Sequence, residues 1–323
     1  MTESDNPDLN SNSAAPAVNA TAAFAGFWRR LGAFFIDTLA LGLFGLLLGL
    51  AIRDVLVGMG GYERFIGFAI VLAYGLLNSR LTGGRTLGKY LLGIRVADLS
   101  GDPISIPRAL LRQTVFSVPF FLNGAPFDEQ TLFSFFGMVI SVLLFGGMFA
   151  IIYLFVFNRK SRRSLHDLVA GTCVVRSVPA GGVPPVAPIW RGHLIVVGIV
   201  ALLSAAAPFL GQKLAGTPTF EALLEANEAL SAQPDVVRSF ISTNLDLDGA
   251  PVHGGYVTVT LIIDNKRVAN EERAREIGRL VLEEYPPARK KQVILVSFVY
   301  GYNMVIASSS QSQTYRFKPE ALE

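Results

Sequence analysis

One uninterrupted apolar run, LFSFFGMVISVLLFGGMFAIIYLFVF at residues 132–157, decides the fold class of this chain. An α-helix rises about 1.5 Å per residue, so this run is long enough to cross the ~30 Å hydrocarbon core of a bilayer. The densest basic cluster of the chain, NRKSRR at residues 158–163, follows it directly. Because cytoplasmic loops collect Lys and Arg, we expect a membrane-spanning helix whose C-terminal end faces the cytoplasm.

The composition of the whole chain also indicates a membrane protein. Of the 323 residues, 51% are hydrophobic and only 16% are charged, whereas roughly 25% of the residues of an ordinary soluble protein are charged. The formal net charge is only +3. The positions of the basic residues therefore indicate the membrane topology and do not point to nucleic-acid binding. A single cysteine, Cys173, excludes an internal disulfide and a multi-cysteine metal site.

Further apolar segments predict four or five helical crossings. Three of these segments are residues 31–52, 65–77 and 189–210. Residues 108–122 contain Pro119 and either cross the membrane as a tilted helix or re-enter as a hairpin. The basic flanks at Arg112 and Arg159 are both expected in the cytoplasm, which requires an even number of crossings between them and favours the tilted helix. The basic loop at residues 80–112 belongs in the cytoplasm with the N-terminus. We therefore expect a multi-pass protein of a bacterial cytoplasmic (inner) membrane.

The chain divides into five predicted parts. These are a disordered cytoplasmic tail at 1–23, a helical membrane domain at 24–176, a Pro/Gly-rich linker at 177–188, a transmembrane helix at 189–210 and an extracytoplasmic domain at 216–323. In the last part, the residue pattern predicts helices near 220–230 and at 268–284, and strands at 256–263, 292–300 and 304–307. The fold class is thus an α-helical multi-pass membrane protein with a small C-terminal α+β extracytoplasmic domain.

Three stretches of the membrane part carry a specific pattern. They are GFWRRLGAFFID at residues 26–37, GRTLGK at 84–89 with GIRV at 93–96, and LHD at 165–167 with GT at 171–172. In this order they resemble the RDD family of membrane proteins, named for an arginine and two aspartates. The resemblance covers residues 24–176 and implies an RDD-like helical bundle without an assigned molecular role, for which cation transport is one proposed activity.

The resemblance also marks individual residues. It places the family arginine at Arg30 and the aspartates at Asp37 and Asp167, and its other motif positions here are Gly88, Lys89 and His166. It implies no enzyme and says nothing about residues 177–323.

Arg30 and Asp37 form the candidate site within the first predicted membrane helix. Seven residues at about 100° each return to nearly the same helix face, so both side chains point towards the same neighbour. Charged residues inside a membrane are costly unless paired, and they often mark ion or proton pathways. The site is therefore either a proton or cation site, or a tether in which Arg30, or a basic residue of another segment, neutralises Asp37. The tether is favoured because no second carboxylate is clearly intramembrane.

Other motifs indicate packing or turns. The segment at residues 83–90 has phosphate-loop spacing, but Tyr90 stands where Ser or Thr would hold magnesium, which argues against nucleotide binding. Gly45 and Gly49 lie one turn apart and would let another helix approach closely, within the chain or from a second copy. His166 and Asp167 are expected in a turn before a strand at 171–175, which would pair with residues 94–97; a pH-sensing histidine is the alternative.

These observations leave two hypotheses for function. The first is transport of a small cation or proton, or support of such transport, and the second is a non-transporting scaffold that presents the extracytoplasmic domain. We expect no enzyme, no cofactor and no metal site, because no nucleophile–base constellation or ligand spacing stands out. The expected partners are the lipid bilayer, a small cation or proton, and either a second copy or an extracytoplasmic protein.

Overall fold

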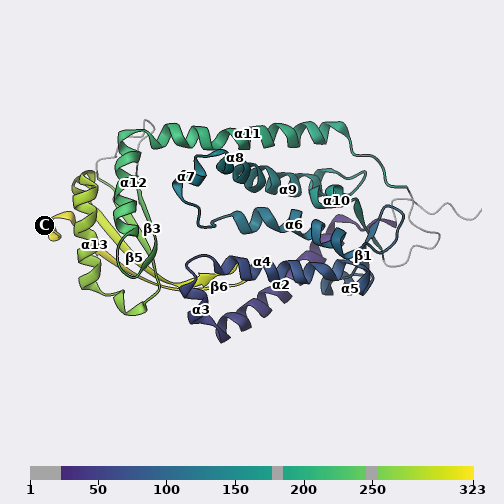
Figure 1. The fold of residues 1–323 in the computed structure, drawn as a ribbon, viewed down its shortest axis with the longest axis horizontal. Helices are drawn as coiled ribbons and strands as arrows, with labels where there is room; N and C mark the ends of the chain where they lie inside the picture. The colour runs from purple at the N-terminus through teal and green to yellow at the C-terminus, as the bar shows by residue number, and fades with distance from the viewer. Residues whose placement is uncertain (1–22, 177–184, 245–253) are drawn as a thin grey trace, which may run out of the picture.

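A computed structural model describes residues 23–176, 185–244 and 254–323. Most of the expected N-terminal tail and part of the Pro/Gly-rich linker lie outside these residues. The longer helices run lengthwise, in alternating directions, between two ends of the membrane part (Figure 1). They are α2 (Phe27–Ala51), α4 (Glu63–Gly75), α6 (Ile106–Leu122), α8 with α9 (Phe135–Ser141 and Gly147–Phe157) and α11 (Arg191–Ala215).

The described helices differ in their ability to cross a bilayer. Three are long and apolar enough: α2, the continuous stretch Phe135–Phe157, and Arg191–Lys213 of α11. Their large apolar side chains, such as Leu39, Leu50 and Leu202, are more than 70% exposed, as expected of helices that face lipid. Helices α4 and α6 are shorter, and α6 is one continuous helix that includes Pro119 and does not turn back as a hairpin.

Short elements close both ends of the bundle. One end carries α5 (Leu87–Leu91), α10 (Leu165–Val169), and the antiparallel pair β1 (Ile94–Asp98) and β2 (Thr172–Arg176). This pairing confirms the predicted small sheet, and an isolated bridge from Phe24 to Val175 extends it. The other end carries α3 (Arg53–Gly58) and α7 (Glu129–Leu132).

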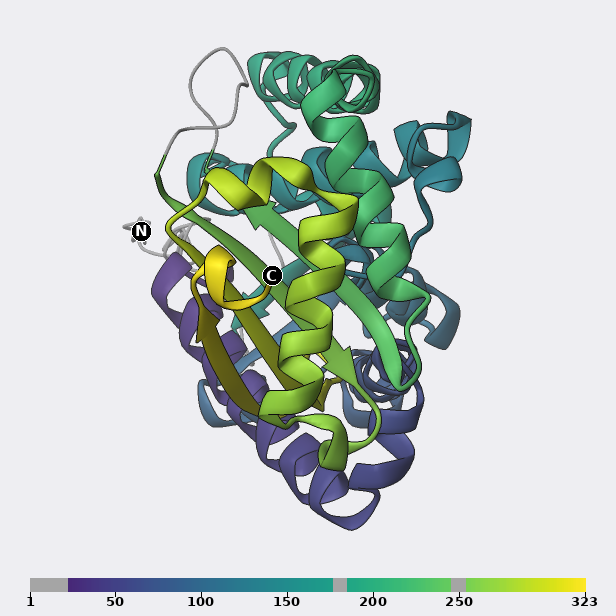
Figure 2. The same cartoon turned by 90° about the vertical axis from the view of Figure 1, so that its left-hand side faces the viewer.

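The C-terminal domain is a four-stranded sheet with two helices. Its strands, in spatial order, are β3 (Val236–Thr243), β4 (Tyr256–Ile263), β5 (Val293–Asn303) and β6 (Ser308–Phe317). Strands β4 and β5 are parallel and are joined through α13 (Glu271–Glu284). Helices α12 (Pro218–Ser231) and α13 cover one face of the sheet, as Figure 2 shows in front of the strands. Alternate β4 residues such as Val257, Val259 and Leu261 are fully buried beneath them.

One prediction for this domain was wrong, and one strand was missed. Residues 304–307 are the turn between β5 and β6 and not a strand: Val305 has φ +70°, and the Met304 amide donates to the Ala307 carbonyl. Of the apolar side chains that suggested a strand, Met304 is fully buried, and Ile306 and Ala307 pack against the same cluster, whereas Val305 is exposed. The sequence prediction also missed β3, in which burial does not alternate clearly.

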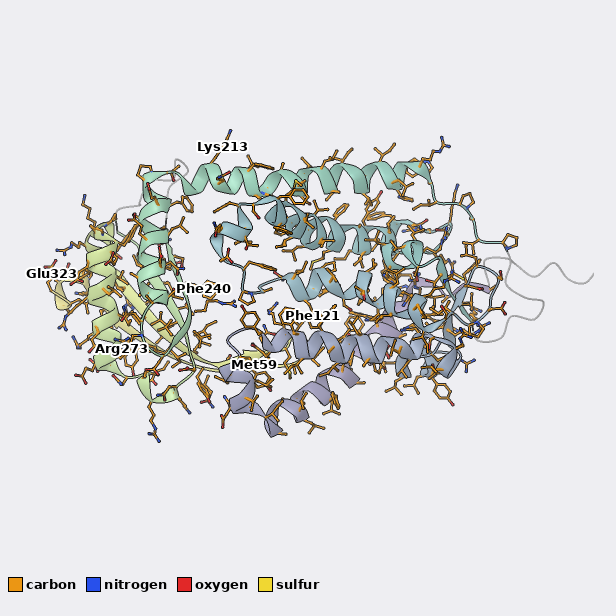
Figure 3. The ribbon with its side chains drawn as sticks, in the orientation of Figure 1. Met59, Phe121, Lys213, Phe240, Arg273 and Glu323 are labelled. Carbon is orange, nitrogen blue, oxygen red and sulfur yellow. The ribbon has the colours of Figure 1, made fainter. Side chains whose placement is uncertain are left out.

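The β5–β6 turn packs into the membrane part. Met304 is fully buried and Tyr302 nearly so, in a cluster with Leu56 of α3; Met59, labelled in Figure 3 beside this contact, is at its edge. A Cβ on Gly49 would overlap the Tyr302 hydroxyl. The close approach predicted at Gly45 and Gly49 is therefore made by this turn and not by another helix.

Candidate functional site

Asp167 is fully buried and lies at the centre of a polar cluster. Ser164 begins α10, and Ser164 and Asp167 form a capping box in which the Ser164 amide donates to Asp167 Oδ2 (3.2 Å). Arg30 Nη2 lies 2.7 Å from Oδ2, and Arg112 donates to Oδ1 through Nη2 (2.9 Å) and Nε (3.1 Å). Thr172 Oγ1 adds a further bond to Oδ1. One carboxylate thus joins α2, α6, α10 and β2.

The electrostatics of the cluster follow from this crowding. Burial alone would raise the pKa of Asp167, but Arg112, His166 and Arg30 outweigh it and hold the pKa below its usual range. Burial lowers the pKa of His166 to about 3, so its ring is neutral near pH 7. That ring lies edge-on to Phe116, and no hydrogen-bond partner is found for its Nδ1 in the described part of the chain. Asp167 is therefore a permanent anion shared by two guanidinium groups.

Asp37 forms a second, separate cluster. Its Oδ1 accepts from the Tyr74 hydroxyl (2.6 Å) and the Gly88 amide (2.7 Å), and its Oδ2 accepts from the Thr86 hydroxyl (2.6 Å). Lys89 Nζ lies 3.7 Å from the same Oδ2. Thr86 is the N-cap of α5, so a carboxylate from α2 satisfies an amide in the first turn of another helix.

The glycine at position 88 makes this contact sterically possible. A Cβ there would overlap the backbone carbonyl of Ala33 on α2. Without a side chain, the start of α5 lies directly against α2, and its amide reaches Asp37. This close approach gives the motif glycine a physical role.

The predicted Arg30–Asp37 pair is not how these residues bond. Seven residues along a helix separate the two side chains by about 10 Å, although they share a face. Arg30 bonds Asp167 instead, and Asp37 takes the donors from α4 and α5 together with Lys89. The predicted tether by a basic residue of another segment corresponds to Lys89.

Sequence analysis missed Arg112, Tyr74 and Thr86 as site residues. The signal for Arg112 was its place within the largely apolar segment 106–122, because a charged residue in such a segment needs a partner. No comparable signal marks Tyr74 or Thr86. No group of three or more His, Cys, Asp or Glu side chains suited to a metal occurs among the described residues.

Comparison with known proteins bears on the part of the chain that holds both clusters. The model of the RDD family matches residues 24–171. This part of the chain belongs to the RDD family. The RDD region is also similar to an uncharacterized protein, YckC, of Bacillus subtilis (strain 168), with 28% identity over 155 residues that cover 48% of this chain and 86% of the relative. No solved structure matches the chain.

In this RDD domain, the residues assigned to the family name serve two clusters. Arg30 and Asp167 belong to one, which ties the start of α2 to the segment after α9. Asp37 belongs to the other, which ties the same helix to α5. Both lie at the end of the bundle that also carries β1 and β2 (Figure 1).

Proposed function

We propose that this protein is a non-transporting membrane scaffold whose RDD domain holds the C-terminal domain at the extracytoplasmic surface for a protein partner. The observation that carries the proposal is the saturation of both buried carboxylates. Asp167 accepts from Arg30, Arg112, Ser164 and Thr172, and these donors come from separate segments. A group bonded in this way fixes segments against one another.

The same geometry disfavours a cation at Asp167. An incoming cation would displace hydrogen-bond donors and meet two guanidinium groups, each within 3 Å of the carboxylate. Removing one partner from a buried pair costs about 3–5 kcal/mol. Asp37 is bonded by three short donors before Lys89 is counted. Carboxylates that are bonded in this way agree better with a role in holding segments together than with binding and release of an ion.

The scaffold also requires a fixed topology. If the helices cross the membrane five times, the segment before α2 and the segment after α11 lie on opposite sides of it. Clusters of basic residues mark the cytoplasmic side. Residues 158–163, the densest cluster, lie at the end away from the C-terminal domain. We therefore place the N-terminus in the cytoplasm of a bacterial cell and residues 216–323 outside the cytoplasmic membrane. A reporter fused after Glu323 should be active only outside the cytoplasm.

The contact between the two domains supports a rigid presentation. Glu63 Oε1 accepts from the Asn303 amide (2.9 Å), and the Tyr300 hydroxyl donates to Asp54 (3.1 Å). Arg53 lies over the Tyr300 ring at 5.5 Å. These polar contacts surround the buried turn of β5–β6, so the domain is held at a second place besides its connection to α11.

The scaffold is tested by two measurements on the full chain. Purified protein in liposomes should give no proton, Na⁺ or K⁺ flux above that of empty liposomes. In cells, site-specific photo-crosslinking from the exposed face of α13 should capture a discrete partner, and a matched probe on the lipid-facing side of α11 should not. Flux that requires the protein and disappears in Asp37→Asn would reject the proposal, and so would crosslinks from α13 that contain only this chain.

The second candidate function is proton-coupled cation exchange at Asp37 and Lys89. Its specific support is Lys89: burial, reinforced by the charge of Arg112, lowers the pKa of this lysine to about 8. A lysine near this pKa can release its proton close to neutral pH, which would remove the positive charge beside the Asp37 carboxylate and let a cation take its place. This candidate expects flux that rises with pH near 8 and is lost in Lys89→Gln, whereas Lys160→Gln, an exposed lysine at the same end, keeps it.

A further inference from the structure

A cavity of about 400 Å³ lies next to the Asp167 cluster. It opens between the first turn of α2 and the last turn of α9, and residues of the following basic loop complete it. Its lining consists of Ala25, Phe27, Trp28, Arg30, Phe155, Val156, Asn158, Arg159 and Arg162. This volume is within the range of small-molecule sites. None of these lining residues is acidic.

Charge in the cavity wall is uncompensated. Arg30 and Arg112 share the one carboxylate of Asp167, so two cations face one anion there. His166 beside them is neutral. Arg30 also forms the cavity wall, with its guanidinium 5.1 Å from the Phe155 ring centroid. An anion in the cavity would therefore restore the local charge balance.

The basic loop is held in position to meet such an anion. Asn158 Nδ2 donates to Ser161 Oγ (2.6 Å) and to the Arg163 carbonyl (2.8 Å), and the Arg162 amide donates to the Asn158 carbonyl (2.9 Å). Arg162 has φ +52°, a conformation that a non-glycine residue adopts only when its surroundings fix it. Arg159, which also lines the cavity, is exposed.

Two of the carbonyl groups at the end of α9 already accept hydrogen bonds within the chain. The Leu154 carbonyl accepts from the Asn158 amide and the Phe157 carbonyl from the Arg159 amide. The facing N-cap of α2 is Gly26, and no side chain caps the first turn of that helix. Free amides at a helix start add to the attraction for an anion.

The aromatic part of the lining identifies the source of the anion. Phe27 and Phe155 pack at 5.0 Å, and Trp28 is 78% exposed beside them. Tryptophan at the end of a membrane helix is typical of the headgroup level of a bilayer. A free phosphate would use only the arginines, whereas a phospholipid would also place its glycerol and first methylenes on these rings.

We propose that this cavity binds the phosphate of an anionic phospholipid headgroup, with Arg159 and Arg162 as its direct ligands. Basic pockets between membrane helices on the cytoplasmic side suit such headgroups. The absence of an acid from the lining residues leaves nothing to receive a choline ammonium, so phosphatidylglycerol binds in preference to phosphatidylcholine. The site is independent of whether the protein transports an ion.

The test uses the full chain with Trp190→Phe, which leaves Trp28 as the only tryptophan. The delipidated protein in a neutral detergent is titrated with phosphatidylglycerol carrying brominated acyl chains, and quenching of Trp28 is followed. Arg159→Ala should raise the lipid concentration at half-maximal quenching about fivefold, which is the loss of affinity expected for one surface arginine on an anionic lipid. Lys160→Ala removes the same charge one residue away, outside the cavity lining, and should leave the lipid concentration at half-maximal quenching unchanged.

Three outcomes would overturn the proposal. One is equal weakening in Arg159→Ala and Lys160→Ala, which would mean general attraction to basic residues. Another is equal quenching by brominated phosphatidylcholine. The third is displacement of the lipid by millimolar inorganic phosphate, which would assign the cavity to a soluble anion. Circular dichroism of each variant keeps loss of fold separate from loss of binding.

Discussion

The buried turn between β5 and β6 offers the sharpest test of how the two domains are joined. Gly67 on α4 lies under this turn, and a Cβ added there would overlap the backbone carbonyl oxygen of Met304. Because backbone cannot rotate away as a flexible side chain can, Gly67→Ala must displace the turn. Overpacking of this kind costs about 1–3 kcal/mol.

That cost falls on the docked state alone. Alanine also improves helix propensity, but α4 is helical whether or not the turn is docked, so this gain cancels. A change of about 1–3 kcal/mol raises the ratio of undocked to docked turn by roughly fivefold to 150-fold. The turn should therefore become accessible while the helices stay folded.

Maleimide labelling of Met304→Cys measures this ratio. The residue at 304 is fully buried, and labelling tracks the open population when the turn opens and closes faster than it reacts. Gly198→Ala is the matched control: Gly198 lies within the apolar helix α11, and its added Cβ would meet no described atom within 4 Å beyond its own stretch of helix. Equal labelling rates in Gly67→Ala, Gly198→Ala and the parent would refute the docking.

Three further predictions concern the polar clusters and the cysteine. Asp167→Asn should lower the apparent melting temperature in detergent, since it leaves two buried guanidinium groups short of charge at a cost of about 3 kcal/mol or more; a drop no larger than that of the more exposed Asp98→Asn would contradict the clamp. The pKa of His166 is lowered from 6.5 to about 3 in the folded protein, so the unfolded chain binds a proton there more readily. The free energy of unfolding should therefore fall as the pH falls from 6.5 to 3, and it should fall more steeply than in His166→Gln. Burial raises the pKa of Cys173 to about 11, so maleimide should label it at neutral pH only after unfolding, and prompt labelling would show that the β1–β2 sheet opens.

Much of the fold follows from local sequence pattern. Hydropathy located α2, the stretch from α8 to α9, and α11, because lipid demands long apolar runs with internally bonded backbone. Alternation of Val, Ile and Thr located β4, whose bounds are those predicted, since one of its faces is buried beneath the helices. Pairing of β1 with β2 was also foreseen, although 73 residues lie between their facing ends.

Pairing of the charged residues was beyond local pattern. Helical periodicity predicted one neighbour for both Arg30 and Asp37, whereas Arg30 bonds α10 and Asp37 bonds α4 and α5. Periodicity carries no information about which segment packs against a helix face. The carboxylate that Arg30 takes is 137 positions away in the chain. Likewise, the two glycines Gly45 and Gly49 predicted a close neighbour, and only the structure identifies it as the turn of another domain.

Helix α2 connects the two features that define this molecule. Arg30 and Asp37 lie in its first half, and the glycines that receive the turn lie in its second half; from Arg30 to Gly49 the helix rises about 28 Å. An uninterrupted helix of this length moves as a rod, so displacement of the turn can reach the polar clusters only by moving all of α2. The first half is fixed by buried ionic bonds and the second by a glycine-lined contact that one methyl group can disturb. Motion between the domains should therefore begin at the turn and leave the Asp167 cluster intact.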